Sequence, residues 1–556
     1  MSLCNFIKNE LEFIKNELEE EIKGCEVCFK ALAQPGKQPL VKIEEEEALK
    51  IPGIEEIKDQ TPESWYQTYN LSLDGYTMFP QPDPVSEEEK AEVVKRFLNG
   101  LSKLLNPKSN WTFIRPLKLS LENCVKCNTC ADACHLYLAS GRKEIYRPNF
   151  RAEVLRRIYE KHFTFTGKLN SWFGEEIEVS YDLIRRLFEL AYRCTLCRRC
   201  VVYCPIGVDN GLIARELRKL FSQELGWAPP EVYQKGTRLH LKAGSSTGMN
   251  PQGIKDTITF LEEEIAEKTG KKIKIPVDKK GAEYLFIHNA GEYISWPDHM
   301  EAFFILFDAA GIDYTISSEP LGYDGVNYGA WYDDIELARI AVNHLKIAHS
   351  LGVKKILVGE CGHAHKVFCV ILDRLLPASS PLAEIKKESC IPLVWEIVKS
   401  GKLKLDPSRN DFYFTLHDSC NIVRLMGIVK PQREVLKKVV PQGRFKEMNP
   451  TGVKNYCCGG GSGFAIMGSL NFPVFRKKVG LKVKLCQIIE TFKDVLTEDK
   501  IKLVVATCSN CKGTIREMEH TYQLFEKYRI THCGLVDLVV NAMADIPPFL
   551  NFEEMF

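Results

Sequence analysis

The chain has 556 residues, long enough for about three or four domains, and 45% of them are hydrophobic and 26% charged, as in an ordinary soluble globular protein. The 74 Lys and Arg residues against 73 Asp and Glu residues leave a formal charge of +1, so nothing global argues for nucleic-acid binding. No run of about 18 apolar residues is present to span a membrane, and the charged N-terminal stretch lacks the apolar segment of a secretory signal. We therefore expect a cytoplasmic protein, or one held at the cytoplasmic face of a membrane by a partner.

Cysteine is unusually frequent, with 21 residues in a long chain that we expect to be intracellular. A disulfide framework is typical of short secreted domains, whereas clustered cysteines in a reducing compartment indicate metal ligands. Eight of the 21 fall into two tight groups and five more form a third pattern. The cysteines therefore direct the search for function.

Residues 1–110 are expected to form an N-terminal extension, because a helical start, an acidic run and a proline-spaced stretch indicate loosely packed, solvated chain. Residues 111–245 carry apolar residues at helical spacing, as in 155–163, 181–193 and 211–225, and predict a helical domain. Most arginines of this domain are expected on solvated faces, or else on a docking surface: Arg142, Arg147, Arg156, Arg185, Arg198 and Arg199.

A linker is predicted at 246–280, with a charged helix around 254–269. From residue 281 onwards short apolar runs alternate with helical stretches, which indicates parallel sheets with helices packed on them. The predicted strands are 283–288, 313–316, 355–360, 411–417 and 502–508, and the predicted helices are 299–310, 335–350 and 475–492. The expected fold class is therefore multidomain, α followed by α/β.

The α/β half contains a faint internal repeat, which divides it into two similar units, 281–405 and 406–556. The matched segments are 283–291 with 412–420, 354–366 with 501–512 and 321–329 with 456–463. In this alignment Gly291 matches Cys420 and Cys361 matches Cys508. Only the second unit keeps a full set of cysteines, so the first is predicted to be a degenerate copy.

Two groups of four cysteines share one spacing, Cys-x2-Cys-x2-Cys-x3-Cys. This spacing lets three thiolates surround one [4Fe–4S] cluster while the fourth reaches the other cluster. The predicted ligands are Cys124, Cys127, Cys130 and Cys204 for the first cubane cluster, and Cys194, Cys197, Cys200 and Cys134 for the second. Zinc is disfavoured because it prefers two pairs of ligands over two identical runs of four. His135 follows Cys134, where the second group has Pro205.

The second α/β unit contains the third pattern: Cys420, Cys457, Cys458, Cys508 and Cys511. Adjacent cysteines suit a larger or split cluster that needs ligands from several directions, and the glycines after Cys458 let the backbone approach sulfur closely. Cys420 and Cys508 each follow a predicted strand, at the edge where open α/β sheets place their sites. Five thiolates exceed the four that an ordinary cluster needs.

These motifs resemble a known family. The two cysteine runs with a long helical interval look like the α-helical ferredoxin module of succinate dehydrogenase-type subunits and heterodisulfide reductases, and the third pattern resembles the CCG domain of the latter. Tandem CCG-type units with the first degenerate are most similar to the DsrK (HmeD) group of heterodisulfide reductase-like proteins. The resemblance covers about 111–545. It implies two cubane [4Fe–4S] clusters and one non-cubane [4Fe–4S] cluster held by the five cysteines of the third pattern.

The resemblance also implies a function. A membrane cytochrome b subunit of the DsrM type would oxidise menaquinol within a larger complex, and the cubanes would relay electrons to the non-cubane cluster. That cluster would reduce a disulfide or trisulfide, with a DsrC-like protein as substrate in dissimilatory sulfur metabolism. Alternatives are the iron–sulfur subunit of a glycolate or lactate oxidase, a methanogen-type CoM–CoB heterodisulfide reductase, and an electron-wiring subunit with structural CCG cysteines.

Residues beside the third pattern have open roles. His417 is a candidate proton donor with a catalytic role, because histidine titrates near neutral pH, and Asp418 is either a second proton donor or a local turn cap. Cys361, with His363 and His365, is expected to be a buried remnant, a small metal site or a wall of the cavity facing Cys508. The remaining cysteines are a weak metal-site candidate, Cys4 with Cys25 and Cys28, and the core residues Cys369, Cys390, Cys486 and Cys533.

Overall fold

The computed structural model describes residues 86–110, 112–170, 177–374, 380–468, 470, 472–550 and 552. The chain forms two compact units, and each is described by itself. Unit 1 contains the described residues up to 233 together with 331–334 and 456–493, and unit 2 contains 234–330, 335–455 and the described residues from 494 onwards. The domain predicted at 406–556 therefore contributes to both units. Cys4, Cys25 and Cys28 lie outside the described residues.

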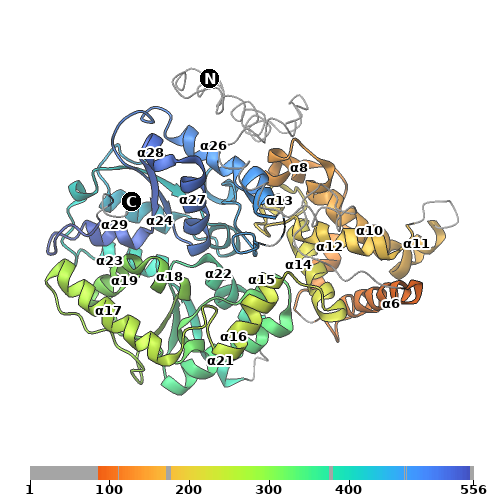
Figure 1. Cartoon of the computed structure of the whole chain (residues 1–556), viewed down its shortest axis with the longest axis horizontal. Coiled ribbons are helices and arrows are strands. Elements are labelled where there is room, and N and C mark those ends of the chain that lie inside the picture. Colours follow the sequence, from red (N-terminus) through yellow and green to blue (C-terminus); the bar gives the residue numbers. More distant parts are fainter. Residues whose placement is uncertain are drawn as a thin grey trace. The chain divides into compact units, whose positions relative to one another are not determined.

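Unit 1 is helical throughout its described part (Figure 1). Its α-helices are α6 (Glu87–Leu104), α7 (Ile114–Glu122), α8 (Thr129–Ala133), α9 (His135–Ala139), α10 (Pro148–Phe163), α11 (Phe165–Asn170), α12 (Tyr181–Tyr192), α13 (Arg199–Tyr203), α14 (Asn210–Leu220), α15 (Pro230–Val232), α25 (Phe472–Phe475) and α26 (Lys482–Thr491). Helix α12 matches the helix expected at 181–193 to within one residue at both ends, whereas α10 begins seven residues before the expected 155 and α14 ends five residues before the expected 225.

Helix α6 differs from the expectation of a loosely packed extension up to residue 110. Ser86 caps the helix by accepting a hydrogen bond from the Glu89 N–H at 3.2 Å, and three glutamates in the first turn favour the helix dipole. Phe97 is fully buried, and its ring lies 5.9 Å from that of Phe221. Because apolar side chains at helical spacing are buried, α6 is an integral part of unit 1.

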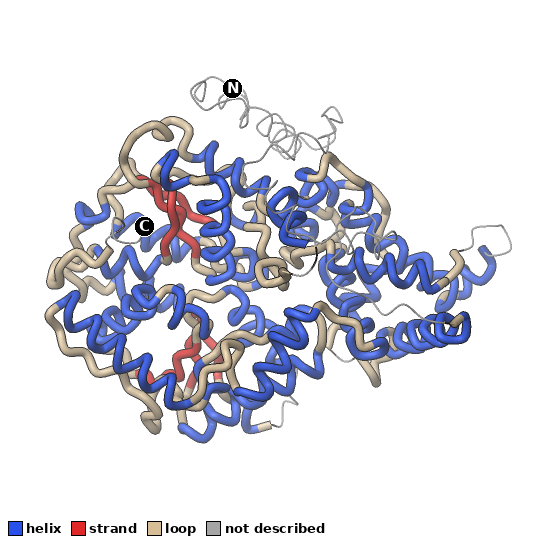
Figure 2. Tube along the Cα trace, viewed as in Figure 1, coloured by secondary structure: helices blue, strands red, loops and turns tan. Residues whose placement is uncertain are grey.

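Unit 2 contains two parallel sheets, drawn in red in Figure 2. The first has the order β2-β1-β3-β4 and the second the order β5-β6-β7. The strands are β1 (Tyr284–Ile287), β2 (Tyr314–Thr315), β3 (Lys355–Val358), β4 (Lys386–Ser389), β5 (Tyr413–His417), β6 (Lys502–Ala506) and β7 (Ile530–Cys533).

Helices connect and cover these strands. They are α16 (Leu239–Ala243), α17 (Pro251–Thr269), α18 (Ala290–Ser295), α19 (Pro297–Ala310), α20 (Pro320–Tyr323), α21 (Asp334–Leu351), α22 (Gly362–His365), α23 (Cys390–Lys399), α24 (Lys430–Val439), α27 (Ser509–Tyr522), α28 (Leu524–Tyr528) and α29 (Leu535–Asn541). Short 3₁₀ stretches span Glu144–Tyr146, Tyr328–Trp331, Leu372–Arg374, Pro381–Glu384, Pro407–Asn410 and Gly452–Lys454, and π-helical stretches span Phe221–Leu225, Tyr233–Arg238, Lys366–Ile371, Asn421–Leu425 and Arg476–Gly480.

The two sheets repeat one arrangement, as the internal repeat predicts. Strand β1 pairs in parallel with β3 from Tyr284–Lys355 to Ile287–Val358, and β5 pairs in parallel with β6 from Tyr413–Lys502 to His417–Ala506. The strands that the sequence aligns, β1 with β5 and β3 with β6, thus occupy equivalent positions. Parallel neighbours bring the loops after their carboxyl ends to one edge of each sheet.

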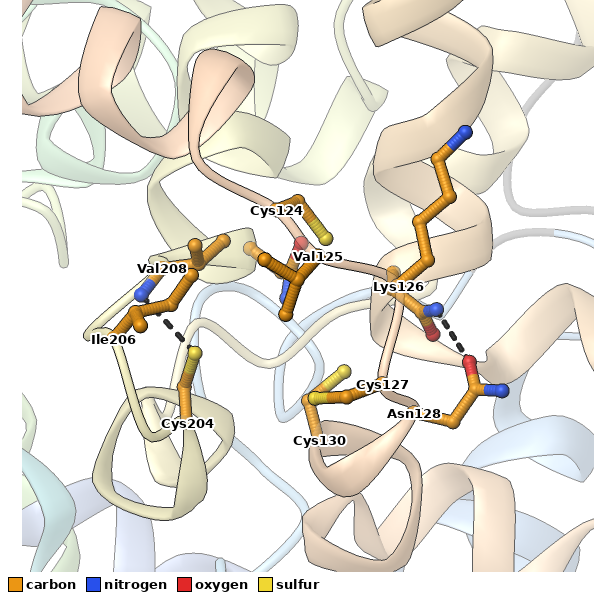
Figure 3. Close-up of a pocket in the computed structure, with 11 residues that line it drawn as sticks. Cys124, Val125, Lys126, Cys127, Asn128, Cys130, Cys204, Ile206 and Val208 are labelled. Carbon is orange, nitrogen blue, oxygen red and sulfur yellow. Dashed lines mark hydrogen bonds between the residues drawn. The ribbon is translucent and has the colours of Figure 1, made fainter.

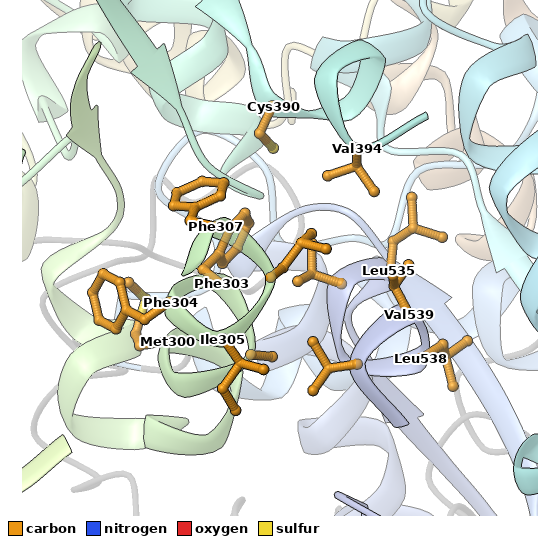
Figure 4. Close-up of a cluster of buried hydrophobic side chains, with 14 of the residues drawn as sticks. Met300, Phe303, Phe304, Ile305, Phe307, Cys390, Val394, Leu535, Leu538 and Val539 are labelled. Carbon is orange, nitrogen blue, oxygen red and sulfur yellow. The ribbon is translucent and has the colours of Figure 1, made fainter. Parts of the chain in front are cut away.

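A single apolar core joins the two sheets of unit 2. Helix α19 contributes Phe303 and Phe307, and α29 contributes Leu535 and Val539, all of them fully buried (Figure 4). Helix α19 is apolar nearly all round because it is covered on every side. The described part of the chain contains no helix that is both long and apolar enough to cross a membrane.

Candidate iron–sulfur sites

The two four-cysteine loops of unit 1 adopt the same unusual backbone conformation. The residues on either side of the second cysteine have positive φ in both loops: Lys126 (55°) and Asn128 (63°) in the first, and Leu196 (51°) and Arg198 (60°) in the second. Left-handed backbone is uncommon for residues other than glycine and costs about 1–2 kcal/mol per residue. Its appearance at equivalent positions indicates two loops shaped for one kind of ligand.

Each loop then leads into a short helix, α8 or α13, which ends at the fourth cysteine. Cys134 and Cys204 both have extended backbone, with φ of −88° and −76°. This turn separates the fourth thiol from the first three. This geometry is what we expect if the fourth cysteine of each motif binds the cluster held by the other motif.

The cysteines predicted for the first cluster line one small cavity that is partly open to solvent (Figure 3). Cys124, Cys127 and Cys130 come from the first loop, and Cys204 comes from the end of α13. The Val208 N–H donates to the Cys204 Sγ at 3.3 Å, the kind of hydrogen bond that stabilises a thiolate ligand. The structure thus brings together three cysteines of one motif and the last cysteine of the other.

The cysteines predicted for the second cluster are also close neighbours. Burial raises the pKa of Cys134, and the nearby thiols of Cys197 and Cys194 raise it further. Burial likewise raises the pKa of Cys200 well above its usual value, and Cys194 and Cys197 again contribute. Because deprotonated thiols so close together repel one another, a bound cation is needed to hold all four as thiolates.

Arg151 supplies an independent indication that anionic groups belong beside these thiols. Its side chain is buried, and its Nη1 atom has no hydrogen-bond partner among the described residues. Burial alone would lower its pKa, but the thiols of Cys194 and Cys134 outweigh this and raise it. A buried guanidinium nitrogen without a hydrogen-bond partner, close to several cysteine thiols, fits a cluster whose sulfide and thiolate charges it would balance.

Several arginines of this unit are buried, which differs from the solvated faces expected from the sequence. Arg156, Arg185 and Arg199 are at most 8% exposed. Arg156 donates to the backbone oxygen of Ser120 at 3.1 Å. A buried guanidinium is stable only when it is paired or hydrogen-bonded, and here backbone oxygens around the cysteine loops accept its hydrogens.

Two of the buried arginines hold the Cys457–Cys458 segment within unit 1. Arg199 lies over the ring of Tyr456 at 4.2 Å and donates to the Ala133 oxygen at 2.7 Å. Arg218 donates to the Cys194 oxygen at 2.5 Å and to the Ser462 oxygen at 3.2 Å. The segment from 456 to 463 therefore shares its supports with the four-cysteine loops.

The glycines after Cys458 allow close packing, as the sequence predicts. Gly459 has a φ of +94°, and a Cβ there would lie 2.3 Å from the Gly480 oxygen. A Cβ on Gly461 would lie 2.7 Å from the Thr195 oxygen. The Gly459 and Gly460 N–H groups lie 3.4 and 3.5 Å from the sulfurs of Cys457 and Cys458 respectively. Backbone N–H groups directed at sulfur are typical of iron–sulfur sites.

In unit 2, Cys420 and Cys508 follow neighbouring strands, β5 and β6. Cys508 is the N-cap of α27, and Cys511 lies in the first turn of that helix. A hydrogen bond of 3.5 Å between the hydroxyls of Thr507 and Ser419 links the two loops. Cys508 and Cys511 are buried, whereas Cys420 is partly exposed.

The loop of Cys361 lies against Cys508, which favours the cavity-wall alternative for this degenerate copy. A Cβ on Gly362 would lie only 2.9 Å from the Cys508 Sγ, and the Ser509 N–H donates to the Glu360 oxygen at 3.2 Å. Cys361 is buried, and burial together with the Cys508 thiol raises its pKa to about 12. The equivalent loops of the two α/β copies thus meet at Cys508.

The small-metal-site alternative for this loop is disfavoured. His365 is hydrogen-bonded through Nδ1 to the Cys361 oxygen at 2.8 Å and through Nε2 to the Ser389 hydroxyl at 2.8 Å. The Nε2 of His363 contacts the Asn327 backbone oxygen at 2.7 Å. Burial lowers the pKa values of His363 and His365 to about 3 and 4, so both rings stay neutral, and the hydrogen bonds of His365 occupy both ring nitrogens that a metal would need.

Asp418 is held by residues distant in sequence, which disfavours proton donation and differs from the expected local turn cap. Arg433 donates to both carboxylate oxygens at 2.8 Å, and the Gly452 N–H donates at 2.6 Å. Burial would raise the pKa of Asp418, but the hydrogen bonds and charge of Arg433 outweigh it and lower the pKa. The carboxylate therefore stays ionised. The neighbouring residue His417, at the end of β5, is buried as well.

Sequence reasoning missed a buried ionic network near α27. Lys512, directly after Cys511, is 1% exposed and pairs with the fully buried Glu292 at 2.7 Å. The Glu360 carboxylate accepts from the Leu535 N–H at 2.9 Å and the Val536 N–H at 3.0 Å. These partners are far apart in the chain, so no local pattern marks them. Of the cysteines expected in the core, Cys390, Cys486 and Cys533 are buried and Cys369 is partly exposed.

Comparisons with known proteins agree with this arrangement. Residues 120–208 match the family model described as a 4Fe-4S dicluster domain, and residues 414–516 match the model of a cysteine-rich domain, CCG. The first span contains both four-cysteine motifs, and the second contains all five cysteines of the third pattern.

Relatives with assigned names share most of the chain. It is 31% identical over 390 residues to the Hdr-like menaquinol oxidoreductase iron-sulfur subunit 2 of Archaeoglobus fulgidus, covering 63% of this chain and 68% of the relative. It is 29% identical, with the same coverage, to the Hdr-like menaquinol oxidoreductase iron-sulfur subunit of Archaeoglobus profundus. It is 22% identical to a subunit of the dihydromethanophenazine:CoB–CoM heterodisulfide reductase of Methanosarcina acetivorans, over 62% of this chain and 79% of the relative. The chain therefore belongs to the family of heterodisulfide reductase-like (Hdr-like) iron–sulfur oxidoreductase subunits.

Proposed function

We propose that this chain is the catalytic subunit of a menaquinol-linked membrane complex that reduces a disulfide or trisulfide. Its eight motif cysteines would hold two cubane clusters, and Cys420, Cys457, Cys458, Cys508 and Cys511 would hold a non-cubane [4Fe–4S] cluster. The observation that carries the proposal is the presence of both domain types in one chain, each with every cysteine of its pattern. When bound, such clusters supply single-electron transfer and, at the third site, a place to hold a half-reduced sulfur.

The residues around the third pattern support a substrate-accessible site. Cys420 is partly exposed, whereas the other four cysteines of the set are buried. Gly362 packs closely against the Cys508 sulfur, so the Cys361 loop would form one wall of this site. Reduction of a disulfide to two thiols consumes two electrons and two protons, and His417, three residues before Cys420, would deliver protons.

The same proposal includes an electron-donating membrane subunit and a protein substrate as partners. A DsrM-like membrane cytochrome b subunit, with other complex subunits, would oxidise menaquinol and feed the cubane clusters. A DsrC-like small protein carrying a trisulfide would be the substrate, in dissimilatory sulfur metabolism. The names of the Archaeoglobus relatives, which mention menaquinol oxidoreductase, support the electron donor.

The test is disulfide reduction by the isolated complex with a reduced menaquinone analogue, measured as free thiol formed. C508S is expected to lower the rate by more than about 100-fold, because changes in the outer shell of a metal site alone cost up to about that factor. C369S is the matched control, since Cys369 is a partly exposed cysteine outside the cluster patterns and is expected to leave the rate unchanged. Full activity in C508S would end the proposal. A co-purifying flavoprotein without haem would favour the glycolate or lactate oxidase alternative instead.

A further inference from the structure

His135 lies at the junction between the second four-cysteine motif and Cys457, within unit 1. A ring nitrogen of His135, the Cys197 Sγ and the Cys457 Sγ all lie within 4.8 Å of one another. The Cys457 Sγ also lies 3.5 Å from the hydroxyl of Thr195, in the same cysteine loop. The three side chains come from α9, from the second loop and from the segment after Tyr456, so the fold brings them together from distant parts of the sequence.

The imidazole of His135 has no structural task that accounts for its position. It is 1% exposed, and neither ring nitrogen has a hydrogen-bond partner among the described residues. A buried polar group without a partner is unfavourable, so such groups are rare unless a ligand completes them. The other side chains of α9 that lie beside it, Leu136 and Leu138, are apolar and buried, as a purely structural position would be.

We propose that His135 is a positioning residue that donates an imidazole N–H to sulfur at Cys197, on the side of the second cluster that faces Cys457. This inference rests on the proposed function, because it assumes that Cys134, Cys194, Cys197 and Cys200 hold a cubane cluster. Those four thiols already complete its ligand set, so His135 acts as a hydrogen-bond donor and not as a fifth ligand. The chemical class that it recognises is the sulfur of an iron-bound thiolate.

The donor has a defined consequence for electron transfer. A hydrogen bond to cluster sulfur stabilises the reduced form, which carries one more negative charge, and so raises the reduction potential. His135 would therefore make the second cluster the better electron acceptor at the point nearest Cys457. An electron would therefore reside mainly on the second cluster before its transfer to the third cluster.

The first test compares H135L with H135Q by redox titration of the holoprotein, followed by electron paramagnetic resonance (EPR). Leucine removes the donor, and we expect one cubane to become harder to reduce by at least a tenfold change in equilibrium constant, about 59 mV for one electron. Glutamine keeps an N–H donor and is expected to restore most of the shift. L136A, an equally buried change in the same helix that removes no donor, should leave both potentials unchanged. Equal potentials in H135L and the wild type would overturn the inference.

The second test uses the unmodified protein and so does not depend on the folding of a variant. Unit 1 contains two histidines, His135 and His162. With ¹⁵N-labelled histidine, pulsed EPR of the reduced protein should show a weak nitrogen coupling that H135Q abolishes. No coupling in a protein that contains both cubanes would refute the inference and leave the proposed function intact, and a coupling strong enough for direct iron ligation would also refute it. A wild-type protein that binds no clusters would refute the proposed function itself.

Discussion

Single residues shape the cluster loops of unit 1 against their backbone preferences. Asn128 has a φ of 63°, in the left-handed region, and its Oδ1 accepts a hydrogen bond from the Asn149 amide at 2.6 Å (Figure 3). Arg198 has the same conformation at the equivalent position of the second loop. The sequence predicts the ligands from their spacing, but no glycine marks this backbone, and of the two residues only Asn128 is of a type that often adopts it.

Substitution at Asn128 should separate backbone strain from the lost hydrogen bond. N128V and N128G both remove the bond from Asn149, but valine is branched at Cβ and is strained at positive φ, whereas glycine is not. We expect N128V to be less stable than N128G by about 1–3 kcal/mol, which corresponds to roughly 2–4 °C per kcal/mol in thermal midpoint. Equal midpoints for the two variants would show that the loop does not need the left-handed conformation.

Gly362 is the glycine of the degenerate copy whose substitution should disturb Cys508 directly. A Cβ there would lie 2.9 Å from the Cys508 Sγ, closer than real Cβ contacts allow, so G362A must displace the sulfur or the loop. We expect G362A to alter the EPR signal of the third cluster and to slow disulfide reduction. The control is G513A in α27, where a Cβ would make an ordinary contact of 3.5 Å with Trp296. An unchanged signal in G362A would show that the Cys361 loop is no wall of the site.

Residue patterns in the sequence predict which cysteines are ligands, but they do not predict which charged side chains surround those ligands. Cysteine spacing is local, and thus the four-cysteine groups and their cavity can be inferred from the motif alone. The burial of Arg156, Arg185 and Arg199 could not be inferred, because their partners are backbone oxygens and sulfurs brought together by folding. His135 was visible only as a departure from proline at the end of the first motif.

At the scale of elements, α29 is held by a buried ion pair. The Asp537 carboxylate lies 2.5 Å from the Nδ1 of His299 and accepts from the Gly534 N–H at 2.7 Å at the start of the helix. Burial would raise the pKa of Asp537, but the charge and hydrogen bond of His299 lower it to about 2. The same partnership outweighs burial at His299 and raises its pKa.

This pair gives unit 2 a defined dependence on pH. The unfolded aspartate binds a proton near its usual pKa of about 3.9, whereas the folded one binds it only near 2, so the stabilisation is present above about pH 4 and is lost as the pH falls. Between pH 5 and pH 3 the free energy of unfolding should fall by about 1 kcal/mol through this group. D537N should be less stable and should lack this component in thermal unfolding. D499N, at an exposed carboxylate, should retain it, and an unchanged slope in D537N would contradict the assignment.

The sequence predicts the strands that have a strong apolar pattern and misses the strands whose apolar pattern is weak. The apolar runs of β1, β3, β5 and β6 identify the central strands of both sheets. Strand β4 was missed because its sequence is KKES and only its last residue is buried, as in an edge strand. Strand β7 was missed because ITHC is short and mixed in polarity, although all four residues are buried. Such segments become strands because they pair with neighbouring strands in the folded protein.

At the scale of the whole molecule, segments that are neighbours in the sequence belong to different compact units. Residues 456–493 are distant in sequence from the four-cysteine motifs and yet belong to unit 1, with Tyr456 packed on Arg199. Cys457 and Cys458 are thus supported by the unit that contains the predicted cubane ligands. A boundary drawn along the sequence at residue 406 could not anticipate this, because the segment returns to unit 1 only after folding.

The most direct test of the account is the iron content and EPR of the oxidised holoprotein after treatment with thiol. Three [4Fe–4S] clusters predict about twelve iron atoms per chain and a signal distinct from those of cubane clusters. C508S should lose about four iron atoms together with that signal and keep both cubanes. About eight iron atoms in the wild type, with no additional signal and no change in C508S, would contradict the third cluster and leave an electron relay alone.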